Sequence, residues 1–295
     1  MAAIDISLGI WLLFGAGIVA LLAIDLLVFA RHHAPTMRES ALWSVGWLAV
    51  AVAFGAGWWL WQGSEAGSQF FAGYLLERSL SLDNIFVFAV ILGYFAVPAR
   101  AQPAVLSWGI GLALGLRLVF ILAGAALLHA FEPTFYVFGV LLLLTAWKLA
   151  RHDQAQEDPA RNPVMRGVRR AFPRATPTAT ALLVVAVTDV VFAVDSIPAI
   201  FAVTRDPFIV FAANAFALLG LRALYFLLAG MRERFVYLSQ GLAAVLGFVG
   251  AKMLLADVWH PPIWLSLVVI AGTLATAAAL SLRVRHSSNR GVRAT

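Results

Sequence analysis

The chain has 295 residues, of which 62% are hydrophobic and only 12% are charged, and its formal net charge is +6. So few charged residues cannot cover the surface of a soluble domain of this length, which excludes a soluble globular fold. The chain contains no cysteine, which excludes a disulfide framework, a thiolate metal site and thiol redox chemistry.

Long apolar runs indicate an all-α, polytopic membrane bundle. The runs at 181–201 and 209–230 are long enough to cross a bilayer, and they do not alternate as the strands of a membrane barrel do. The first run, 6–30, is too long for the apolar part of a signal peptide and no basic residue precedes it, so we interpret it as a span. We expect about nine transmembrane helices. In chain order they cover residues 6–30, 40–61, 70–96, 103–128, 134–150, 178–203, 208–230, 235–256 and 262–282.

The basic residues alternate between the predicted loops. Odd-numbered loops and the C-terminal tail carry nearly all of them, whereas the even-numbered loops hold only Arg205. The positive-inside rule then predicts an N-terminus outside and a C-terminus in the cytoplasm of a bacterial inner membrane. Membrane topology accounts for the positive charge, so we expect lipid and not nucleic acid as a partner. The predicted bundle covers 1–282, with a cytoplasmic loop at about 151–177 and a short basic cytoplasmic tail at 283–295.

The third and sixth predicted spans carry acids in the same pattern. Glu77 precedes Asp83 by six residues, and Asp189 precedes Asp195 by six. The register that pairs Asp83 with Asp189 is also possible, and it matches the offsets of the following arginines and lysines better. The next span in each half contains Gly-Leu-Arg, and the one after it ends with a lysine. Because each unit has an odd number of spans, its second copy is inverted, an arrangement typical of secondary transporters that bind substrate near the midplane. The two predicted units of three helices cover about 70–150 and 178–256.

Ionisable side chains lie within the predicted spans. Each charge near the bilayer centre costs about 2.5–3.5 kcal/mol, so the acids must face cations, water or a bound metal. Structural ion pairing is the alternative to a metal path, but it needs no pattern repeated in inverted halves. The intramembrane acids are Asp25, Glu77, Asp83, Asp189 and Asp195, and the counter-ions or gating residues that we expect beside them are Arg117, Arg222 and Lys252.

The side chains next to the acids complete an oxygen ligand set. Asn84 follows Asp83 and Ser196 follows Asp195, and carboxylate, amide and hydroxyl oxygens suit Mg2+, Ca2+ or Mn2+. Zn2+ and copper would favour His or Cys. Pro198 removes a backbone donor and is expected to kink its helix near 194–197, which would free carbonyls beside Asp195. The choice among the hard ions stays open at this point.

Two segments, Leu80–Phe88 and Thr188–Phe208, resemble the TerC/Alx family of integral membrane proteins, and the resemblance runs from the first span to about Leu255. It implies an exporter of Mn2+, with links to alkaline pH, tellurite resistance and the supply of Mn2+ to secreted metalloproteins. One departure is Ala186, where the family pattern usually has an acid. The positions that match the family motifs are Asp25, Glu77, Asp83, Asn84, Asp189, Asp195 and Ser196.

Export of a divalent cation against an inside-negative potential costs about 4.6 kcal/mol per 100 mV. The sequence has no phosphate-binding P-loop motif, so we expect coupling to protons, which carboxylates can carry. The alternatives are a membrane scaffold or metallation partner that binds Mn2+ without transporting it, and a tellurite-resistance protein. We expect no enzyme, because the sequence shows neither a nucleophile–base pair nor a metal–His motif.

Overall fold

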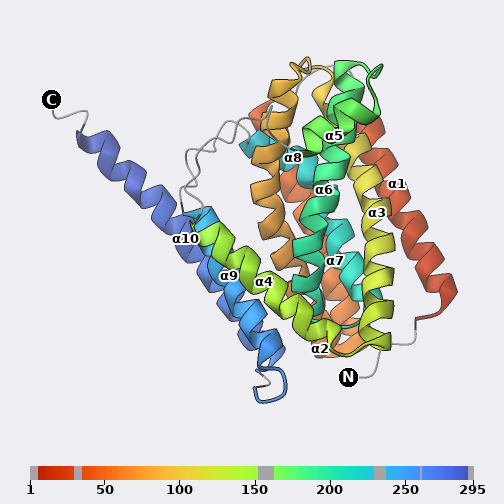
Figure 1. The fold of residues 1–295 in the computed structure, drawn as a ribbon, viewed down its shortest axis with the longest axis vertical. Helices are drawn as coiled ribbons and strands as arrows, with labels where there is room; N and C mark the ends of the chain where they lie inside the picture. Colours follow the sequence, from red (N-terminus) through yellow and green to blue (C-terminus); the bar gives the residue numbers. More distant parts are fainter. Residues whose placement is uncertain (1–5, 30–34, 152–162, 229–236, 260, 292–295) are drawn as a thin grey trace.

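The computed structural model describes residues 6–29, 35–151, 163–228, 237–259 and 261–291, without the side chains of 28–29 and 282–291. Every regular element in these ranges is a helix, which confirms the all-α prediction. The helices pack into an upright bundle, with α4, α9 and α10 crossing one side of it (Figure 1). They are α1 (Leu8–Phe29), α2 (Met37–Tyr94), α3 (Gln102–Ala130), α4 (Thr134–Arg151), α5 (Pro163–Ala171), α6 (Pro177–Phe201), α7 (Pro207–Leu219), α8 (Leu221–Leu228), α9 (Leu238–Leu254) and α10 (Ile263–Gly291).

Six of the described helices are long and apolar enough to cross a membrane, namely α1, α2, α3, α4, α6 and α10. There are up to seven if α7 and α8, which meet at an angle of 42°, form one broken span. The chain is therefore a multi-pass membrane protein. The count of about nine spans stays a prediction, as does the inverted repeat.

The 58-residue helix α2 folds back on itself at one glycine. Gly63 has φ 92° and ψ 173°, a backbone conformation that L side chains rarely adopt. A Cβ added at Gly55 would lie 2.5 Å from the Phe71 ring, and one at Gly67 would lie 2.6 Å from Trp59. Each of these contacts joins two residues that lie the same number of sequence positions before and after Gly63. The two halves, 37–62 and 64–94, therefore pack against each other, and they correspond to the second and third predicted spans.

Helix α7 is the central helix of the bundle. Its residues from Phe208 to Leu219 are all buried, so other parts of the protein surround it on every face. Asp206 starts the helix: its Oδ1 accepts hydrogen bonds from the backbone N–H of Phe208 at 2.8 Å and of Ile209 at 3.3 Å. Gly220 ends it, and α8 begins at the next residue in a new direction.

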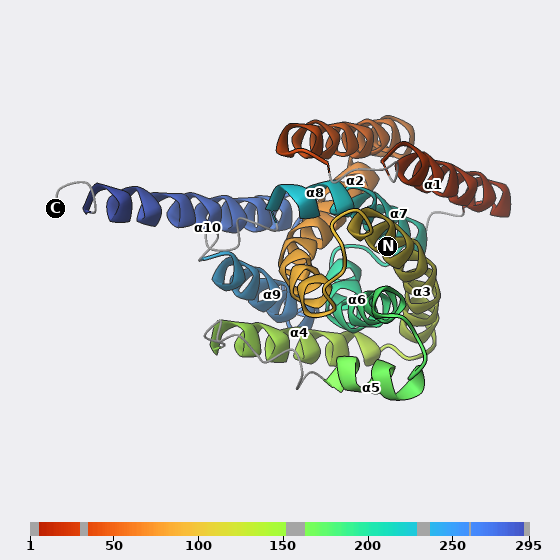
Figure 2. The same cartoon turned by 90° about the horizontal axis from the view of Figure 1, so that it is seen from above.

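Helices α4 and α9 form a close antiparallel pair beside the bundle (Figure 1). Gly139 of α4 faces Leu254 at the end of α9, and Gly250 of α9 faces Leu142 of α4. Glycine at both positions lets the two backbones approach, as is common between membrane helices. Helix α10 packs on α9 and α2 and then extends away from the bundle (Figure 2).

The predicted loop at 151–177 contains a helix that the sequence interpretation missed. Helix α5 buries Met165 and Val168, three residues apart, and packs against α6. Helix α10 continues past 282 to Gly291, although the part that is apolar enough to cross a membrane ends at Ser281, so the tail predicted at 283–295 begins within a helix. Its added turns contain no Gly or Pro before Gly291, so nothing local stops the helix.

Helix α6 has no interruption near 194–197, and the kink expected there stays a prediction. The helix is continuous from Pro177 to Phe201, and Pro198 lies in its last turn. The missing N–H of Pro198 removes one hydrogen bond, but the Ala202 N–H still bonds to the Pro198 carbonyl. A proline this close to the end of a helix removes one donor and leaves the preceding turns intact.

Candidate functional site

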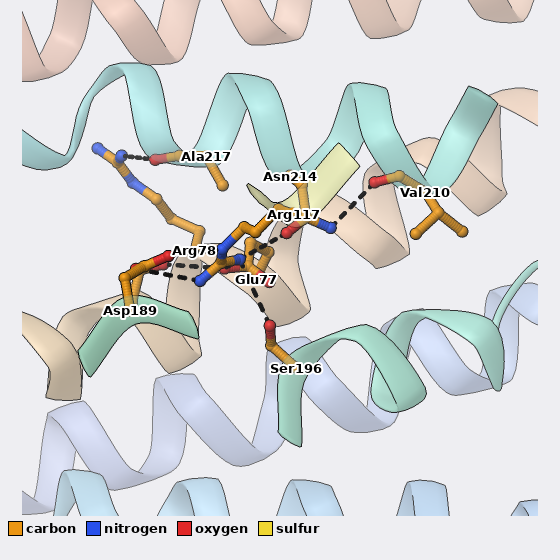
Figure 3. A network of polar contacts seen from close by, with 9 residues as sticks. Glu77, Arg78, Arg117, Asp189, Ser196, Val210, Asn214 and Ala217 are labelled. Atoms are coloured by element: carbon orange, nitrogen blue, oxygen red, sulfur yellow. Dashed lines mark hydrogen bonds and ion pairs between the residues drawn. The ribbon is translucent and has the colours of Figure 1, made fainter. Parts of the chain in front are cut away.

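Arg117 is the centre of a buried polar network in the bundle interior. It lies near the middle of α3 with a side-chain exposure of 0%, and it is among the largest fully buried side chains. Its guanidinium points toward side chains from α2, α6 and α7 (Figure 3). Four helices therefore meet at this one cation.

Two carboxylates from different predicted units bind Arg117. Its Nε donates to Oδ2 of Asp189 at 2.8 Å and its Nη2 to Oδ1 at 3.2 Å, a bidentate pair. Its Nη1 pairs with Oε1 of Glu77, on the second half of α2. Both acids are buried, with side-chain exposures of 0% for Glu77 and 2% for Asp189. If all three groups are ionised, this apolar interior holds one more negative than positive charge.

Neutral oxygens surround the same guanidinium. Nη1 of Arg117 also donates to Oδ1 of Asn214 at 2.5 Å and to Oγ of Ser196 at 3.4 Å. Asn214 is oriented by its own Nδ2, which donates to the carbonyl of Val210 at 3.0 Å. Together with Oε1 of Glu77, three oxygens therefore lie around Nη1 of Arg117. This nitrogen has only two hydrogens, so it cannot donate a full hydrogen bond to each of them.

The second carboxylate oxygen of Glu77 has no hydrogen-bond partner in the described part of the chain, although it is buried. Its Oε1 takes the available donors, Arg117 Nη1 and the Ser81 hydroxyl at 3.3 Å. Leaving a buried charged oxygen unpaired costs more than about 1–3 kcal/mol, the penalty for a neutral group. The network therefore has an unsatisfied acceptor at its centre, which a proton or a metal ion could satisfy.

The network is not a ready-made metal site. Within the described ranges, no three His, Cys, Asp or Glu side chains gather where they could hold a metal ion. The arrangement around Arg117 explains this, because a guanidinium lies between Glu77 and Asp189. These two acids and the oxygens of Ser196 and Asn214 are hard donors that fit Mg2+, Ca2+ or Mn2+ once the guanidinium moves aside.

Asp25 belongs to a different buried pair. Its Oδ1 and its backbone carbonyl both accept from Nη2 of Arg222 at 2.8 Å. Nη1 of Arg222 donates to the Ser107 hydroxyl of α3 at 3.0 Å. The pair joins α1 to α8 and α3, so Asp25 and Arg222 lie outside the Arg117 network.

Asp195 faces another helix. Its Oδ1 accepts from the Thr145 hydroxyl of α4 at 2.9 Å, whereas Asp189 faces Arg117. Six residues on a straight helix turn the side chain by about 120°, so the two acids point in different directions. Lys252 also lies outside the Arg117 network, and its Nζ donates to the Ser266 hydroxyl of α10 at 3.0 Å.

Asp83 and Asn84 lie on the second half of α2, one to two turns beyond Glu77. Asn84 is buried and Asp83 is half-buried, and the hydrogen bonds of Arg117 go to neither of them. Ala186 is buried three residues before Asp189, so an acid there would lie on a neighbouring part of the same helix face.

The structure adds three polar residues to the predicted set. Asn214 contacts Arg117, and Ser81 contacts Glu77 from one turn along the same helix. The spacing of Ser81 from Glu77 was the available signal for that contact. Arg78 turns the other way, and its Nη1 donates to the carbonyl of Ala217 at 2.8 Å, just before α7 ends (Figure 3).

Comparison with known proteins matches residues 62–289 to the family described as "Integral membrane protein TerC family". "Uncharacterized membrane protein STKORF319" of Myxococcus xanthus is 46% identical over 301 residues, 95% of this chain and 94% of that protein. "Putative membrane-bound redox modulator Alx" of Escherichia coli K12 is 41% identical over 312 residues, 96% of this chain and 97% of that protein.

The protein of the same name from Salmonella typhi is 41% identical over 313 residues, 97% of each chain. No solved protein structure matches this chain. The family match includes Glu77, Arg117 and Asp189, so the network belongs to the matched region. The chain belongs to the TerC family of integral membrane proteins.

Proposed function

We propose that the protein exports a hard divalent cation, with Mn2+ as its cargo, through the interior around Arg117. One observation carries the proposal: the buried Oε2 of Glu77 has no partner in the described part of the chain. It lies in a network of two carboxylates and a single guanidinium, which favours the arrival of further positive charge.

Formal charge indicates how the cargo and Arg117 would exchange. Two carboxylates with Arg117 carry −1, whereas the same carboxylates with a divalent cation carry 0. A metal bound to Glu77 and Asp189 would repel the guanidinium, so Arg117 must swing away as the ion enters and return as it leaves. Arg117 thus acts as an internal counter-ion that keeps the acids ionised between transport cycles.

The name of the relatives, "redox modulator", is compatible with this cargo. The present chain has no cysteine, so its own side chains offer no thiol chemistry. Removal of a redox-active metal from the cytoplasm would alter redox balance without a thiol. In this proposal the protein lies in the bacterial inner membrane with its C-terminus in the cytoplasm, protons move in exchange, and secreted Mn-dependent proteins receive the ion.

The test is Mn2+ flux in proteoliposomes that contain a metal-sensitive dye, with a pH gradient imposed or absent. Wild type should carry Mn2+ faster with the gradient, while Glu77→Gln and Asp189→Asn should lose the flux. Asp257→Asn is the matched control, because it removes an exposed carboxylate that bonds to the Tyr136 hydroxyl at 2.5 Å outside the network. This control should transport as wild type does.

Three outcomes would contradict the proposal. Flux in Glu77→Gln equal to that of wild type would make the acids structural. Mn2+ binding without flux in wild type would favour a scaffold or metallation partner. Flux of tellurite instead of Mn2+ would favour oxyanion transport, which the acid-rich network disfavours because carboxylates repel anions.

A further inference from the structure

A pocket of about 510 Å3 opens at one end of the bundle, away from the Arg117 network. It lies where the last turn of α2 meets α5 and the start of α6, beside the short helix that the sequence interpretation missed. Aromatic rings and one arginine form much of its wall. Among its lining residues are Tyr94, Phe95, Arg169, Phe172, Pro173 and Thr180.

The chain around this pocket is strongly basic. The segments 94–103 and 163–180, which meet there, contain five arginines and neither Asp nor Glu. The N-terminal end of the 25-residue helix α6 adds partial positive charge from its backbone N–H groups. An anion is therefore the matching ligand. The arginines are Arg100, Arg166, Arg169, Arg170 and Arg174.

Helix α5 positions one of these arginines at the pocket. Burial of Met165 and Val168 against the bundle fixes which face of the helix points outward. On the exposed side, Nη1 of Arg169 donates to the hydroxyl of Tyr94 at 3.2 Å, which joins α5 to the end of α2. A guanidinium has five N–H donors, so Arg169 can keep this bond and still bind a phosphate with two others.

The surroundings of the pocket favour a lipid as the source of that anion. Tyr94 ends the second half of α2, and tyrosines at the ends of spans lie at headgroup level. Phe172 leaves 52% of its surface exposed just after α5, where an acyl chain could cover it.

We propose that this pocket binds the headgroup phosphate of an anionic phospholipid. Arg169 contacts the phosphate, Tyr94 holds the guanidinium in place, and Phe172 packs against the glycerol or the first part of the acyl chain. The other four arginines attract the anionic leaflet without belonging to the specific site.

The experiment is native mass spectrometry of the full chain in detergent, titrated with phosphatidylglycerol or phosphatidylcholine. Wild type should retain phosphatidylglycerol in preference. Arg169→Ala should weaken that binding about tenfold or more, as expected for loss of a charge-assisted hydrogen bond. Arg170→Ala is the matched control, since it removes the same charge from the next residue of α5, which does not line the pocket. It should change binding by less than about twofold.

Equal losses of phosphatidylglycerol binding in Arg169→Ala and Arg170→Ala would contradict a specific site in the pocket. They would indicate only general electrostatic attraction between the arginines and the lipid. An absence of preference for phosphatidylglycerol in wild type would overturn the anionic ligand. Displacement of the bound lipid by millimolar inorganic phosphate would show a free-phosphate site instead. Helical content measured by circular dichroism shows whether each variant has folded, and Tyr94→Phe, which frees Arg169 without removing its charge, should weaken binding by a smaller factor.

Discussion

The two carboxylate oxygens of Glu77 have different surroundings in the apolar interior of this protein. Its Oε1 accepts from Arg117 and Ser81, whereas its Oε2 is buried without a partner in the described part of the chain. A residue selected only for stability would not keep that oxygen, because a neutral side chain of the same shape avoids the penalty. The cost is consistent with a function in which a cation visits the site.

Substitution of Glu77 should affect the stability of the protein and its Mn2+ flux differently. Glu77→Gln removes the excess negative charge and keeps an oxygen for Arg117, but it places two buried amide N–H donors where Oε2 has no partner, so the free energy of unfolding should change by less than about 1 kcal/mol. Mn2+ flux should fall in the same variant. The thermal midpoint by intrinsic tryptophan fluorescence, measured beside the flux assay, checks both. A variant that loses stability and flux together would indicate that Glu77 is a structural acid.

At the scale of elements, the junction of α7 and α8 depends on a side chain from another helix. The break at Gly220 leaves carbonyls at the end of α7 without helical N–H partners, and Arg78 donates to one of them, that of Ala217. A Cβ at Gly220 would lie 2.7 Å from Nη1 of Arg78 and 3.1 Å from the Cβ of Trp47. Glycine is needed there because the guanidinium approaches the backbone so closely.

Gly220→Ala should therefore displace Arg78 and leave the Ala217 carbonyl unsatisfied. We expect a loss of about 1–3 kcal/mol in the free energy of unfolding, the usual penalty for an unpaired buried acceptor. Gly111→Ala is the matched control, because a Cβ there meets nothing within 4 Å and alanine is the better helix former. Thermal unfolding of the two variants should shift in opposite directions, and equal shifts would contradict the role of Arg78.

At the scale of the whole molecule, α1 lies outside the predicted repeat units and is joined to them by a buried ion pair. Asp25 of α1 meets Arg222 of α8, which in turn bonds to Ser107 of α3. Side-chain exposure at this pair is 2% for Arg222 and 5% for Asp25. Most of α1 presents apolar residues outward, so this pair is its polar attachment to the described bundle.

Asp25→Asn should weaken that attachment. It removes the carboxylate that Arg222 pairs with, and breaking a buried pair in this way costs about 3–5 kcal/mol. Hydrogen exchange should show faster opening of α1 while the Arg117 network keeps its protection. An Asp25→Asn, Arg222→Met double variant should recover part of the loss, and failure to recover would mean that the pair is not what holds α1.

Much of this fold is predictable from composition, because long apolar runs leave no alternative to membrane helices. Which charged side chains pair with each other is much harder to predict from the sequence. In a helix whose lipid-facing and core-facing residues are both apolar, periodicity does not indicate which way Asp189 or Asp195 points. Arg117 meets Asp189 across 72 positions of sequence and Asn214 across 97, and no local pattern encodes those contacts.

The repeated acids nevertheless identified Glu77 and Asp189 as candidates, because an ionisable residue inside a membrane is functional by default. The kink expected at Pro198 stays a prediction, and the position of this residue in the last turn of α6 became clear only with the end of the helix at Phe201. Helix α5 was missed because its apolar side is just Met165 and Val168 among many arginines.

The one-residue turn at Gly63 limits how this molecule can move. The halves of α2 are joined by one residue and pack against each other, so we expect them to move together. The second half carries Glu77, and the first half carries Trp47, which lies close to the α7–α8 junction. We therefore expect any movement of the first half of α2 against the α7–α8 junction to carry the second half, and Glu77 with it.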